Sequence, residues 1–256
     1  MLFIRQILSI AIASFAMLLC SNKSMASVIY FGEDINSSAT GSSENAVRIA
    51  YPNSMAARNS FLANLQGVAI ETFESYSANY SISSLSFGPD TAILAPNLTV
   101  LNIPSGTFNG VYPISGNKTL LQTIGNPNTF SIEFSQPQAA FGFYATDIEI
   151  PNNLKLRFLL ADGITSIDRT VPTMAGIGGA NHTGSVIFYG VIDTSNLFKQ
   201  VSFLRTLNTG DGFGFDDMII GRLENVSPIP EPSTLVIAAT LFSVSLLRGR
   251  NRRRKS

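Results

Sequence analysis

The run of residues 154–160 is the feature that most restricts how this chain folds. Its leucine and phenylalanine side chains alternate with Lys155 and Arg157, so an extended strand places the hydrophobic positions mainly on one face. A turn containing Gly163 follows, and residues 164–171 form a second strand-like run. The pattern predicts a β-hairpin with one face packed against a core and the other in water.

Turn-forming residues recur through the middle of the chain at the spacing typical of an all-β sandwich or barrel. Further strands are expected at residues 98–103, 119–124, 129–134, 139–146, 185–191, 199–207 and 213–222. About nine or ten strands in all favour two facing sheets. The sequence therefore predicts one all-β domain over residues 27–226, a jelly-roll-like β-sandwich, long enough to bury a core without disulfides.

Two groups of hydrophobic residues predict what lies against and inside this sandwich. One short N-terminal helix is expected, beginning at Pro52-Asn53-Ser54 and ending by Gly67. The hydrophobic residues at near-helical spacing are Met55, Phe61, Leu62 and Leu65. Eight phenylalanines are expected to fill the interior: Phe130, Phe134, Phe141, Phe143, Phe188, Phe203, Phe213 and Phe215.

The composition excludes several classes of function. Residues 27–227 hold nine basic and sixteen acidic residues, a net charge of −7 that does not suit a nucleic-acid partner. The only cysteine, Cys20, lies in a segment expected to be removed, which excludes thiolate metal sites and cysteine nucleophiles. The only histidine, His182, lies in a glycine-rich loop at residues 176–184, where we expect a solvated imidazole. This loop lacks the Gly-Lys-Ser/Thr ending of a phosphate-binding loop.

Residues 1–26 have the three parts of a secretory signal peptide. Arg5 supplies the positive charge, residues 7–19 are almost uninterruptedly apolar, and Ser24-Met25-Ala26 offers a cleavage site. We therefore expect export through the general secretory route. A retained N-terminal anchor is the alternative.

The C-terminal region combines three elements in order. Pro230-Glu231-Pro232 opposes regular helix and strand, residues 233–247 are uncharged and mostly apolar, and residues 248–256 form a basic, arginine-rich tail. At about 1.5 Å per residue the apolar run reaches about 22 Å, short of a hydrocarbon core of about 30 Å, so it predicts a marginal transmembrane helix. The basic tail favours the cytoplasmic side and places the acidic domain outside.

Together these elements resemble the PEP-CTERM sorting signal of exported bacterial proteins, here residues 227–256. The resemblance implies recognition by an exosortase, a membrane enzyme thought to cut near Pro230-Glu231-Pro232. It further implies transient membrane anchoring by the C-terminal helix, followed by delivery to the cell surface or to an exopolysaccharide matrix. A permanent tail anchor without processing is the alternative.

Two acidic segments mark the ends of the predicted strand region. Glu71-Thr72-Phe73-Glu74 opens it, and residues 211–221 close it with Asp211, Asp216 and Asp217. First and last strands often meet in jelly rolls, so we expect these segments to lie close together. Adjacent residues of a strand point to opposite faces, so Asp216 and Asp217 cannot both face solvent on one sheet surface without a bulge, and one of them requires a partner.

Calcium is one such partner, because it takes hard oxygen ligands and relieves the cost of burying a carboxylate. The two segments with the helix before them look like a pattern found in exported PEP-CTERM proteins. The last strand is loosely similar to those of carbohydrate-binding jelly rolls, where an Asp helps to hold a structural calcium. The resemblance implies Glu74 and Asp216 as ligands, with Asp217 or Asp211 as substitutes. The alternative is that these carboxylates accept hydrogen bonds from backbone and hydroxyl groups.

These observations favour a non-enzymatic surface or matrix protein of structural or binding role, with an exosortase and extracellular polysaccharide as partners. The alternative is a secreted carbohydrate-binding or carbohydrate-active protein that uses two carboxylates. The chain has no tryptophan for sugar stacking. Its tyrosines in the strand region are Tyr76, Tyr80, Tyr112, Tyr144 and Tyr189. A concave face with two facing acids and tyrosines favours the enzyme, and a flat Ser/Thr/Asn surface favours the first hypothesis.

Overall fold

A computed structural model describes residues 27–37, 46–122, 129–175, 177, 182–206 and 212–227. The predicted signal peptide, Asp211 and the sorting region beyond Ser227 lie outside these residues. Within the described part, no helix is both long enough and apolar enough to span a membrane.

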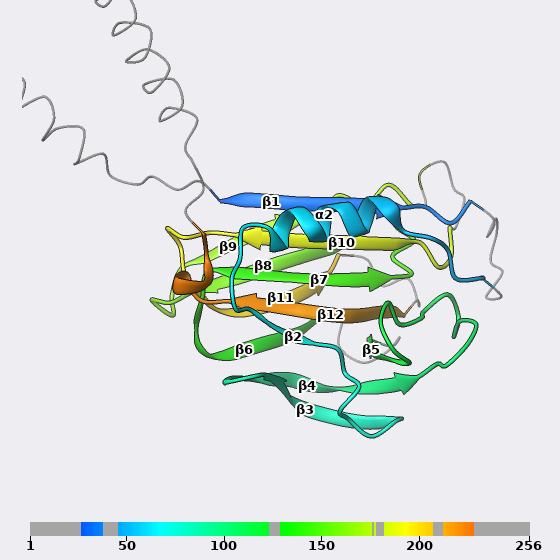
Figure 1. The fold of residues 1–256 in the computed structure, drawn as a ribbon, viewed down its shortest axis with the longest axis horizontal. Helices are drawn as coiled ribbons and strands as arrows, with labels where there is room; N and C mark the ends of the chain where they lie inside the picture. The colour runs from blue at the N-terminus through cyan, green and yellow to red at the C-terminus, as the bar shows by residue number, and fades with distance from the viewer. Residues whose placement is uncertain are drawn as a thin grey trace, which may run out of the picture.

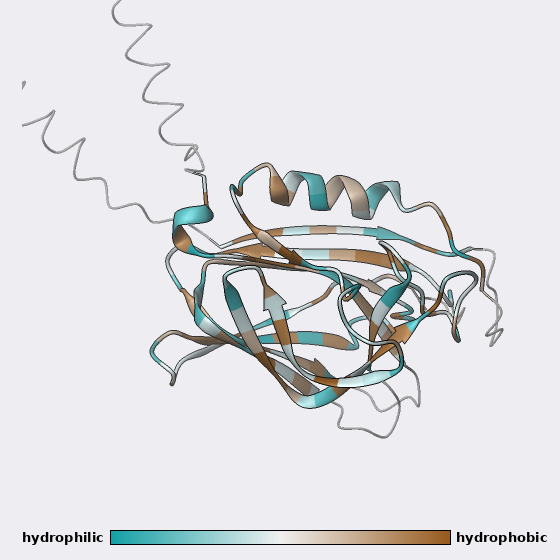
Figure 2. Ribbon diagram, turned by 60° about the horizontal axis from the view of Figure 1, so that its bottom comes forward, coloured by the Kyte–Doolittle hydropathy of each residue, from teal (hydrophilic) through white to brown (hydrophobic). Residues whose placement is uncertain are grey.

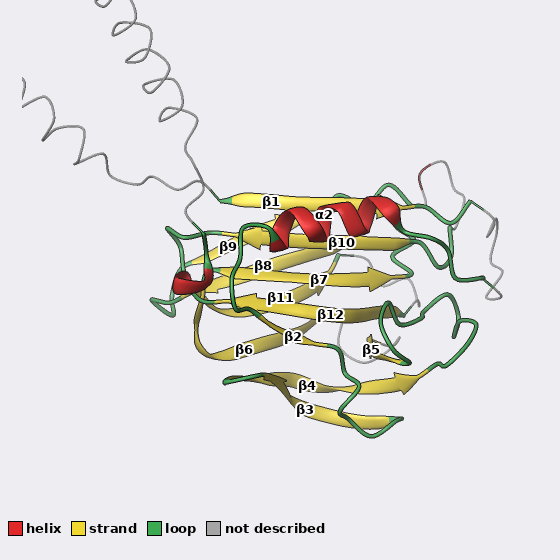
Figure 3. Ribbon diagram, in the orientation of Figure 1, coloured by secondary structure: helices red, strands yellow, loops and turns green. Residues whose placement is uncertain are grey.

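Strands dominate the described residues, which also contain one α-helix and one short 3₁₀ helix (Figures 1 and 3). The strands are β1 Val28–Asp34, β2 Ala69–Glu71, β3 Tyr80–Phe87, β4 Asp90–Asn102, β5 Lys118–Gln122, β6 Thr129–Gln138, β7 Ala140–Thr146, β8 Leu154–Leu160, β9 Ser166–Thr170, β10 Val186–Ile192, β11 Phe198–Arg205 and β12 Phe213–Gly221. The helices are α2 Pro52–Leu62 and η2 Leu223–Asn225.

All strands belong to one antiparallel sheet of order β1-β10-β7-β12-β5-β4-β6-β11-β8-β9, with β2 beside β12 and β3 beside β4. The sheet curls so that its two halves face each other across aromatic side chains. Phe143 of β7 lies 5.1 Å from Phe203 of β11, and Phe215 of β12 lies 5.4 Å from Phe130 of β6, between ring centroids. The predicted all-β sandwich is confirmed. Pairing of β4 with β5 joins its two layers into one sheet instead of two separate ones.

The layer formed by β4, β6, β11, β8 and β9 has one buried and one uncovered face. Hydrophobic residues alternate with polar ones along these strands (Figure 2), so the inward positions enter the core and the outward ones meet solvent. The predicted hairpin is β8 and β9, which pair from Lys155↔Thr170 to Leu159↔Ser166.

In the other layer α2 packs on β1, β10 and β7 (Figure 1), and β7, β10 and β12 are buried on both faces. Phe61 of α2 lies over Gly142 and Gly190, which are direct partners on β7 and β10. A Cβ atom at Gly190 would come within 2.8 Å of the Phe61 ring. All eight predicted core phenylalanines are buried, but Phe188 packs under the helix with Phe61 and not between the layers.

The helix begins at Pro52, as predicted, and ends at Leu62, before Gly67, and Met55 is 48% exposed. The Ser54 hydroxyl does not cap the helix, because it donates to backbone carbonyls of β1 and β10. Instead the carboxylate of Asp34 on β1 accepts the backbone N–H groups of Asn53 (3.1 Å) and Ser54 (2.8 Å). The helix start is therefore held by a residue remote in sequence.

Candidate functional site

The two acidic segments lie side by side, as the sequence predicts. Strand β2 pairs with β12 so that Glu71 faces Met218. In β12 the register with β7 shifts between Asp216, opposite Tyr144, and Ile219, opposite Gly142. This register shift marks a β-bulge, and Asp217 there has a φ of 45°. Asp216 and Asp217 are 1% and 6% exposed, so both carboxylates are buried.

Both aspartates bind residues 114–118, the connection that enters β5, which we call the anchored segment. Oδ2 of Asp216 accepts the backbone N–H of Ile114 (2.7 Å) and of Ser115 (3.0 Å). Its Oδ1 accepts the N–H of Asp217 (2.7 Å), and Oδ1 of Asp217 accepts the Ser115 hydroxyl (2.5 Å). Two carboxylates thus fix one end of the anchored segment.

Glu74 holds the other end of the anchored segment. Its Oε1 accepts the backbone N–H groups of Asn117 (2.8 Å) and Lys118 (2.7 Å). The Lys118 ammonium donates to the backbone carbonyls of Glu74 and Tyr76, both at 2.7 Å. Gly116 has a φ of 58°, and a Cβ there would come within 2.5 Å of the Glu74 carboxyl. The structure therefore gathers Glu74, Asp216 and Asp217 around five consecutive residues.

The three predicted calcium ligands, Glu74, Asp216 and Asp217, accept hydrogen bonds from backbone and hydroxyl groups, as the alternative interpretation expects. Both oxygens of Asp216 and one of Glu74 already accept N–H donors. Within the described residues, no group of three or more His, Cys, Asp or Glu side chains is arranged to hold a metal ion. Calcium stays a prediction for experiment.

Electrostatics make Asp216 the unusual member of this group. Burial raises the pKa of Asp216 well above its ordinary value, and the neighbouring Asp217 raises it further. The three backbone N–H donors oppose the shift because they favour the charged form. This carboxyl is therefore poised to take up a proton more readily than an exposed aspartate.

Glu71 is a further buried carboxylate that the sequence did not single out as a site residue. Its Oε1 accepts the N–H of Phe73 (2.7 Å), a residue with a φ of 61°. Its Oε2 accepts the Tyr76 hydroxyl (3.1 Å) and the N–H of Ser86 (3.2 Å). The anchored segment was missed too, and only its Ser-Gly-Asn turn composition marked it locally.

Other acidic side chains of the described domain also accept backbone N–H groups. Glu33 accepts the N–H of Met174 (2.8 Å), and Asp147 accepts the N–H of Gly184 (2.8 Å). Asp193 accepts the N–H of Asn196 (2.8 Å). Several carboxylates of the described domain therefore hold the backbone of loops.

The tyrosines do not assemble an aromatic platform. Tyr112, Tyr144 and Tyr189 are at most 2% exposed, and burial raises the pKa of Tyr112 and of Tyr189 to about 12. Tyr80 is 62% exposed. His182 is half-buried, not fully solvated as expected, with Nδ1 3.4 Å from the carbonyl oxygen of Asn36.

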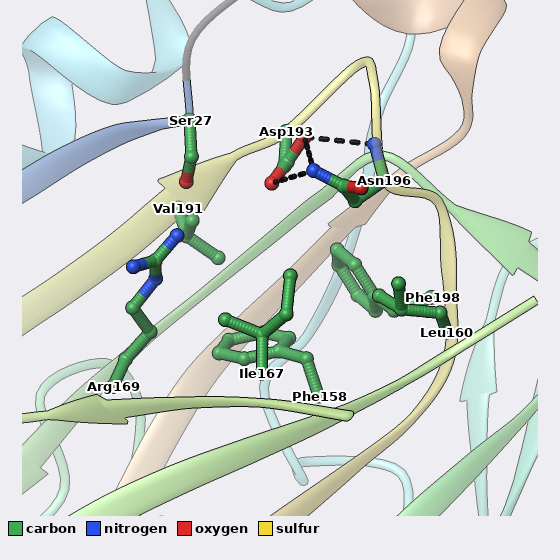
Figure 4. A pocket seen from close by; sticks show the side chains of 9 residues that line it. All are labelled: Ser27, Phe158, Leu160, Ile167, Arg169, Val191, Asp193, Asn196 and Phe198. Carbon is green, nitrogen blue, oxygen red and sulfur yellow. Dashed lines mark hydrogen bonds between the residues drawn. The ribbon is translucent and has the colours of Figure 1, made fainter. Parts of the chain in front are cut away.

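Figure 4 shows a pocket at the seam between the two end strands, β1 and β9. Phe158, Ile167 and Phe198 lie at its hydrophobic side, and Asp193 and Asn196 are bonded to each other at its rim. Its interior of about 10 Å³ is the space of a single water molecule. The seam pocket is therefore too small for a sugar ring.

The larger candidate surface is the uncovered side of the second layer, which we call the open face. Its rows, read across the strands, are Ile93-Glu133-Gln200-Leu159-Ser166, Ala95-Ser131-Ser202-Arg157-Asp168 and Thr129-Leu204-Lys155-Thr170. Every residue of these rows is exposed or half-buried. Arg157 binds Asp168 with two hydrogen bonds of 2.7 and 2.9 Å, which leaves the row centred on Ser202 neutral.

No protein-family model matches this sequence, and no curated protein matches it. Several solved structures are distantly similar in shape. The K2 cleaved adhesin domain of Lys-gingipain is 16% identical, over 60% of this chain and 97% of that one, with a TM-score of 0.39. The C-terminal family 22 carbohydrate-binding module of Clostridium thermocellum Xyn10B is 16% identical, over 64% and 98%, with a TM-score of 0.34. TmCBM61, solved with β-1,4-galactotriose, is 16% identical, over 54% and 90%, with a TM-score of 0.27. Similarities this weak carry no argument about the function of this chain.

Proposed function

We propose that this chain is an exported, non-enzymatic protein of the cell surface or extracellular matrix that binds polysaccharide through its open face. The non-enzymatic part of this proposal rests on the hydrogen bonds that the buried carboxylates make. Asp34, Glu71, Asp147, Asp193 and Asp216 all accept backbone N–H groups. Acids committed to holding loops are poorly placed to serve as the facing pair of a glycoside hydrolase.

The open face suits a hydroxyl-rich polymer. It is the uncovered side of one layer of the curled sheet, and its short hydroxyl and amide side chains both donate and accept hydrogen bonds. Protein interfaces are enriched in large aromatic anchors, and the rows of the open face contain none. Its charges, Glu133, Asp168, Arg157 and Lys155, balance to zero, which suits a neutral chain.

The termini of the domain are compatible with delivery by a C-terminal signal. Val28 pairs with Ile192, Ile192 with Ala140, and Ala140 with Gly221, so the first and last strands meet at one end of the domain. A tail that leaves beside this end keeps the open face unobstructed. We propose that residues 227–256 are read by an exosortase at Pro230-Glu231-Pro232 after export directed by residues 1–26.

Binding is tested with the full chain against a glycan array and against exopolysaccharide from the host. Ser202→Glu adds a charge at the centre of the open face, and Ser60→Glu adds the same charge on the exposed side of α2 as the matched control. We expect Ser202→Glu to weaken binding by at least about tenfold, or about 1.4 kcal/mol, and Ser60→Glu to leave it unchanged. Equal binding by both variants rejects the open face, and release of reducing sugar from the bound polymer rejects a non-enzymatic role.

Sorting is tested separately in the host. Mass spectrometry of the mature protein is expected to find no peptide beyond about Ser233, and a chain lacking residues 228–256 is expected to be misdelivered. Recovery of the intact arginine-rich tail at the cell surface rejects processing. Unaltered delivery of the shortened chain rejects the sorting role.

A further inference from the structure

The end of the domain where β12 passes into η2 gathers several strand ends. Gly221 of β12 pairs with Ala140 of β7, and Phe198 of β11 pairs with Gln138, two residues before Ala140. Phe198 also pairs with Leu160, where β8 ends. Three connections therefore lie at this end of the domain, which we call the tail end (Figure 1): the β8–β9 turn at 161–165, the β10–β11 connection at 193–197, and η2.

The tail end is also where the chain leaves the domain, close to its apolar run. The N–H of Ser227 donates to the carbonyl of Asn64 (2.9 Å), so this residue is fixed to the domain. Residues 228–232 alone separate it from the uncharged run at 233–247. Five intervening residues allow six steps of at most about 3.6 Å, so the run begins within about 22 Å of Ser227.

A tether this short decides which surface of the domain meets a membrane. When the run at 233–247 is inserted, as the sequence predicts, the tail end stays within about 22 Å of the bilayer. Strands β7 and β10 have seven residues each, about 20 Å in length, so the opposite end can lie a strand length farther away. Tethering also raises the effective concentration of the tail end at the lipid, so contacts too weak to hold a free protein can orient a tethered one.

The tail end presents apolar side chains on fixed connections. Ile164 in the β8–β9 turn is 87% exposed, the highest value of any large hydrophobic residue in the described chain, and Leu223 on η2 is 47% exposed. Oδ1 of Asp162 accepts the N–H groups of Ile164 and Thr165, both at 2.9 Å, and its Oδ2 accepts the Thr165 hydroxyl (2.6 Å). Singly exposed apolar residues are common on protein surfaces, but these two lie where the tether brings the lipid.

The described part of the tail end has no excess of basic side chains to attract anionic headgroups. Its exposed or half-buried charges are Arg222 and Glu224 beside η2, and Asp162 and Lys199 beside the β8–β9 turn. Arg222 is also engaged by Asp90, to which its Nε donates (2.9 Å). Electrostatic binding to anionic lipid takes a cluster of about 4–8 basic residues. Apolar contact is therefore the attraction that this surface offers.

We propose that, before processing, the tail end rests on the outer surface of the membrane that holds residues 233–247, with Ile164 and Leu223 in contact with lipid. The inference rests on the membrane anchoring that is part of the proposed sorting, and it adds an orientation. Because the strands run away from the tail end, the open face then stands off the bilayer and stays free for a polymer. Pro230-Glu231-Pro232 then lies between the domain and the membrane, within reach of a membrane enzyme.

The test uses the full chain, made in a host without an exosortase so that residues 228–256 are retained, and reconstituted in vesicles of phosphatidylethanolamine and phosphatidylglycerol. The chain has no tryptophan, so one introduced tryptophan reports its own position through quenching by brominated lipid. Ile164→Trp reports from the tail end. Phe108→Trp is the matched control in an exposed turn at the opposite end, beside Gly110 and Asp147. We expect Ile164→Trp to lose most of its fluorescence and Phe108→Trp, about 20 Å farther from the lipid, to lose little.

A second substitution in the Ile164→Trp chain tests the apolar contact itself. Leu223→Asn removes the other apolar side chain, and Met174→Asn, a similarly exposed residue at the opposite end, is its control. We expect Leu223→Asn to lower the ratio of docked to undocked chain about threefold and Met174→Asn to leave it unchanged. Exchange of phosphatidylglycerol for phosphatidylcholine is expected to leave the quenching unchanged. Circular dichroism of each variant establishes that it is folded.

Flotation of the vesicles separates failure of this inference from failure of the anchoring. A chain that does not float with the vesicles overturns both. A chain that floats, with equal quenching in Ile164→Trp and Phe108→Trp, overturns the tail-end contact and leaves the anchoring intact. Quenching that disappears without phosphatidylglycerol, or that Leu223→Asn does not change, overturns the apolar contact. Polysaccharide binding by the open face is measured independently and survives each of these outcomes.

Discussion

Removing the Asp216 carboxylate is the sharpest test of the view that acids hold this domain together. The variant Asp216→Ala leaves three backbone N–H groups without their acceptor: a buried one at Asp217 and partly buried ones at Ile114 and Ser115. An unsatisfied buried donor costs about 1–3 kcal/mol, and partly exposed donors recover some of that from water. The substitution also removes the cost of burying a carboxylate, which offsets part of this loss. We expect a net loss of about 3 kcal/mol in the free energy of unfolding.

Urea unfolding followed by far-UV circular dichroism measures this loss, since the chain has no tryptophan for fluorescence. For a domain of this size, 1 kcal/mol corresponds to about 2–4 °C, so the melting temperature is expected to fall by about 6–12 °C. The control is Asp168→Ala, which breaks an exposed pair and is expected to cost less than about 1 kcal/mol. A cost no greater than that of the control refutes the anchoring role of Asp216.

The pH dependence of the same variant checks the state of the carboxyl. Because the pKa of Asp216 is raised in the folded state, the folded chain takes up a proton at a higher pH than the unfolded chain does. Its contribution to stability is therefore greatest below the ordinary aspartate pKa and is lost as the pH rises through the raised value. The advantage of the parent chain over Asp216→Ala should grow as the pH falls from 7 towards 4. If the advantage shrinks instead, the three N–H donors lower the pKa of Asp216 by more than burial raises it.

Three further predictions concern the helix, the glycines and calcium. Asp34→Ala removes the acceptor at the start of α2 and is expected to cost about 1 kcal/mol in urea unfolding, against no change for Ser60→Ala. Gly190→Ala drives a methyl group into the Phe61 ring and is expected to cost about 1–3 kcal/mol, most of it recovered by adding Phe61→Leu; no recovery would place the strain elsewhere. EDTA is expected to leave the melting temperature unchanged, because N–H donors already occupy both oxygens of Asp216. A fall of several degrees, reversed by added calcium, would favour the predicted calcium site.

The sequence predicted the parts of the fold in which local pattern and burial agree. Strong alternation located β8 and β9, and hydrophobic runs located β7, β10 and β12. Strand β3 was not located individually, because half of its residues Tyr80–Phe87 are serine and its burial pattern is irregular. Strand β1 was missed as well, although it supplies Glu33 and Asp34, which fix a loop and the helix. Local hydrophobicity does not reveal which strand carries an anchoring side chain.

The sequence singled out Glu74, Asp216 and Asp217 but not the residues that they hold. The adjacency of Asp216 and Asp217 drew attention to them, because two neighbouring strand residues point to opposite faces and one of them then needs a partner. The residues that they hold lie about a hundred positions earlier, as with Ile114 and Asp216, which are 102 apart. Such a contact leaves no periodic signal in either segment. The identity of the anchored segment therefore required the three-dimensional fold.

The positions of the acids also explain how a domain of net negative charge presents an open face of balanced charge. Without disulfides, long connections between strands need other fixed contacts, and carboxylates that accept successive backbone N–H groups provide them. In the described residues these include Glu33, Asp34, Glu71, Glu74 and Asp216. Much of the acidity therefore serves loops away from the open face, where the two acids of the rows face two bases. On the proposed function, a neutral polymer approaches this face without repulsion, although the domain as a whole carries a net negative charge.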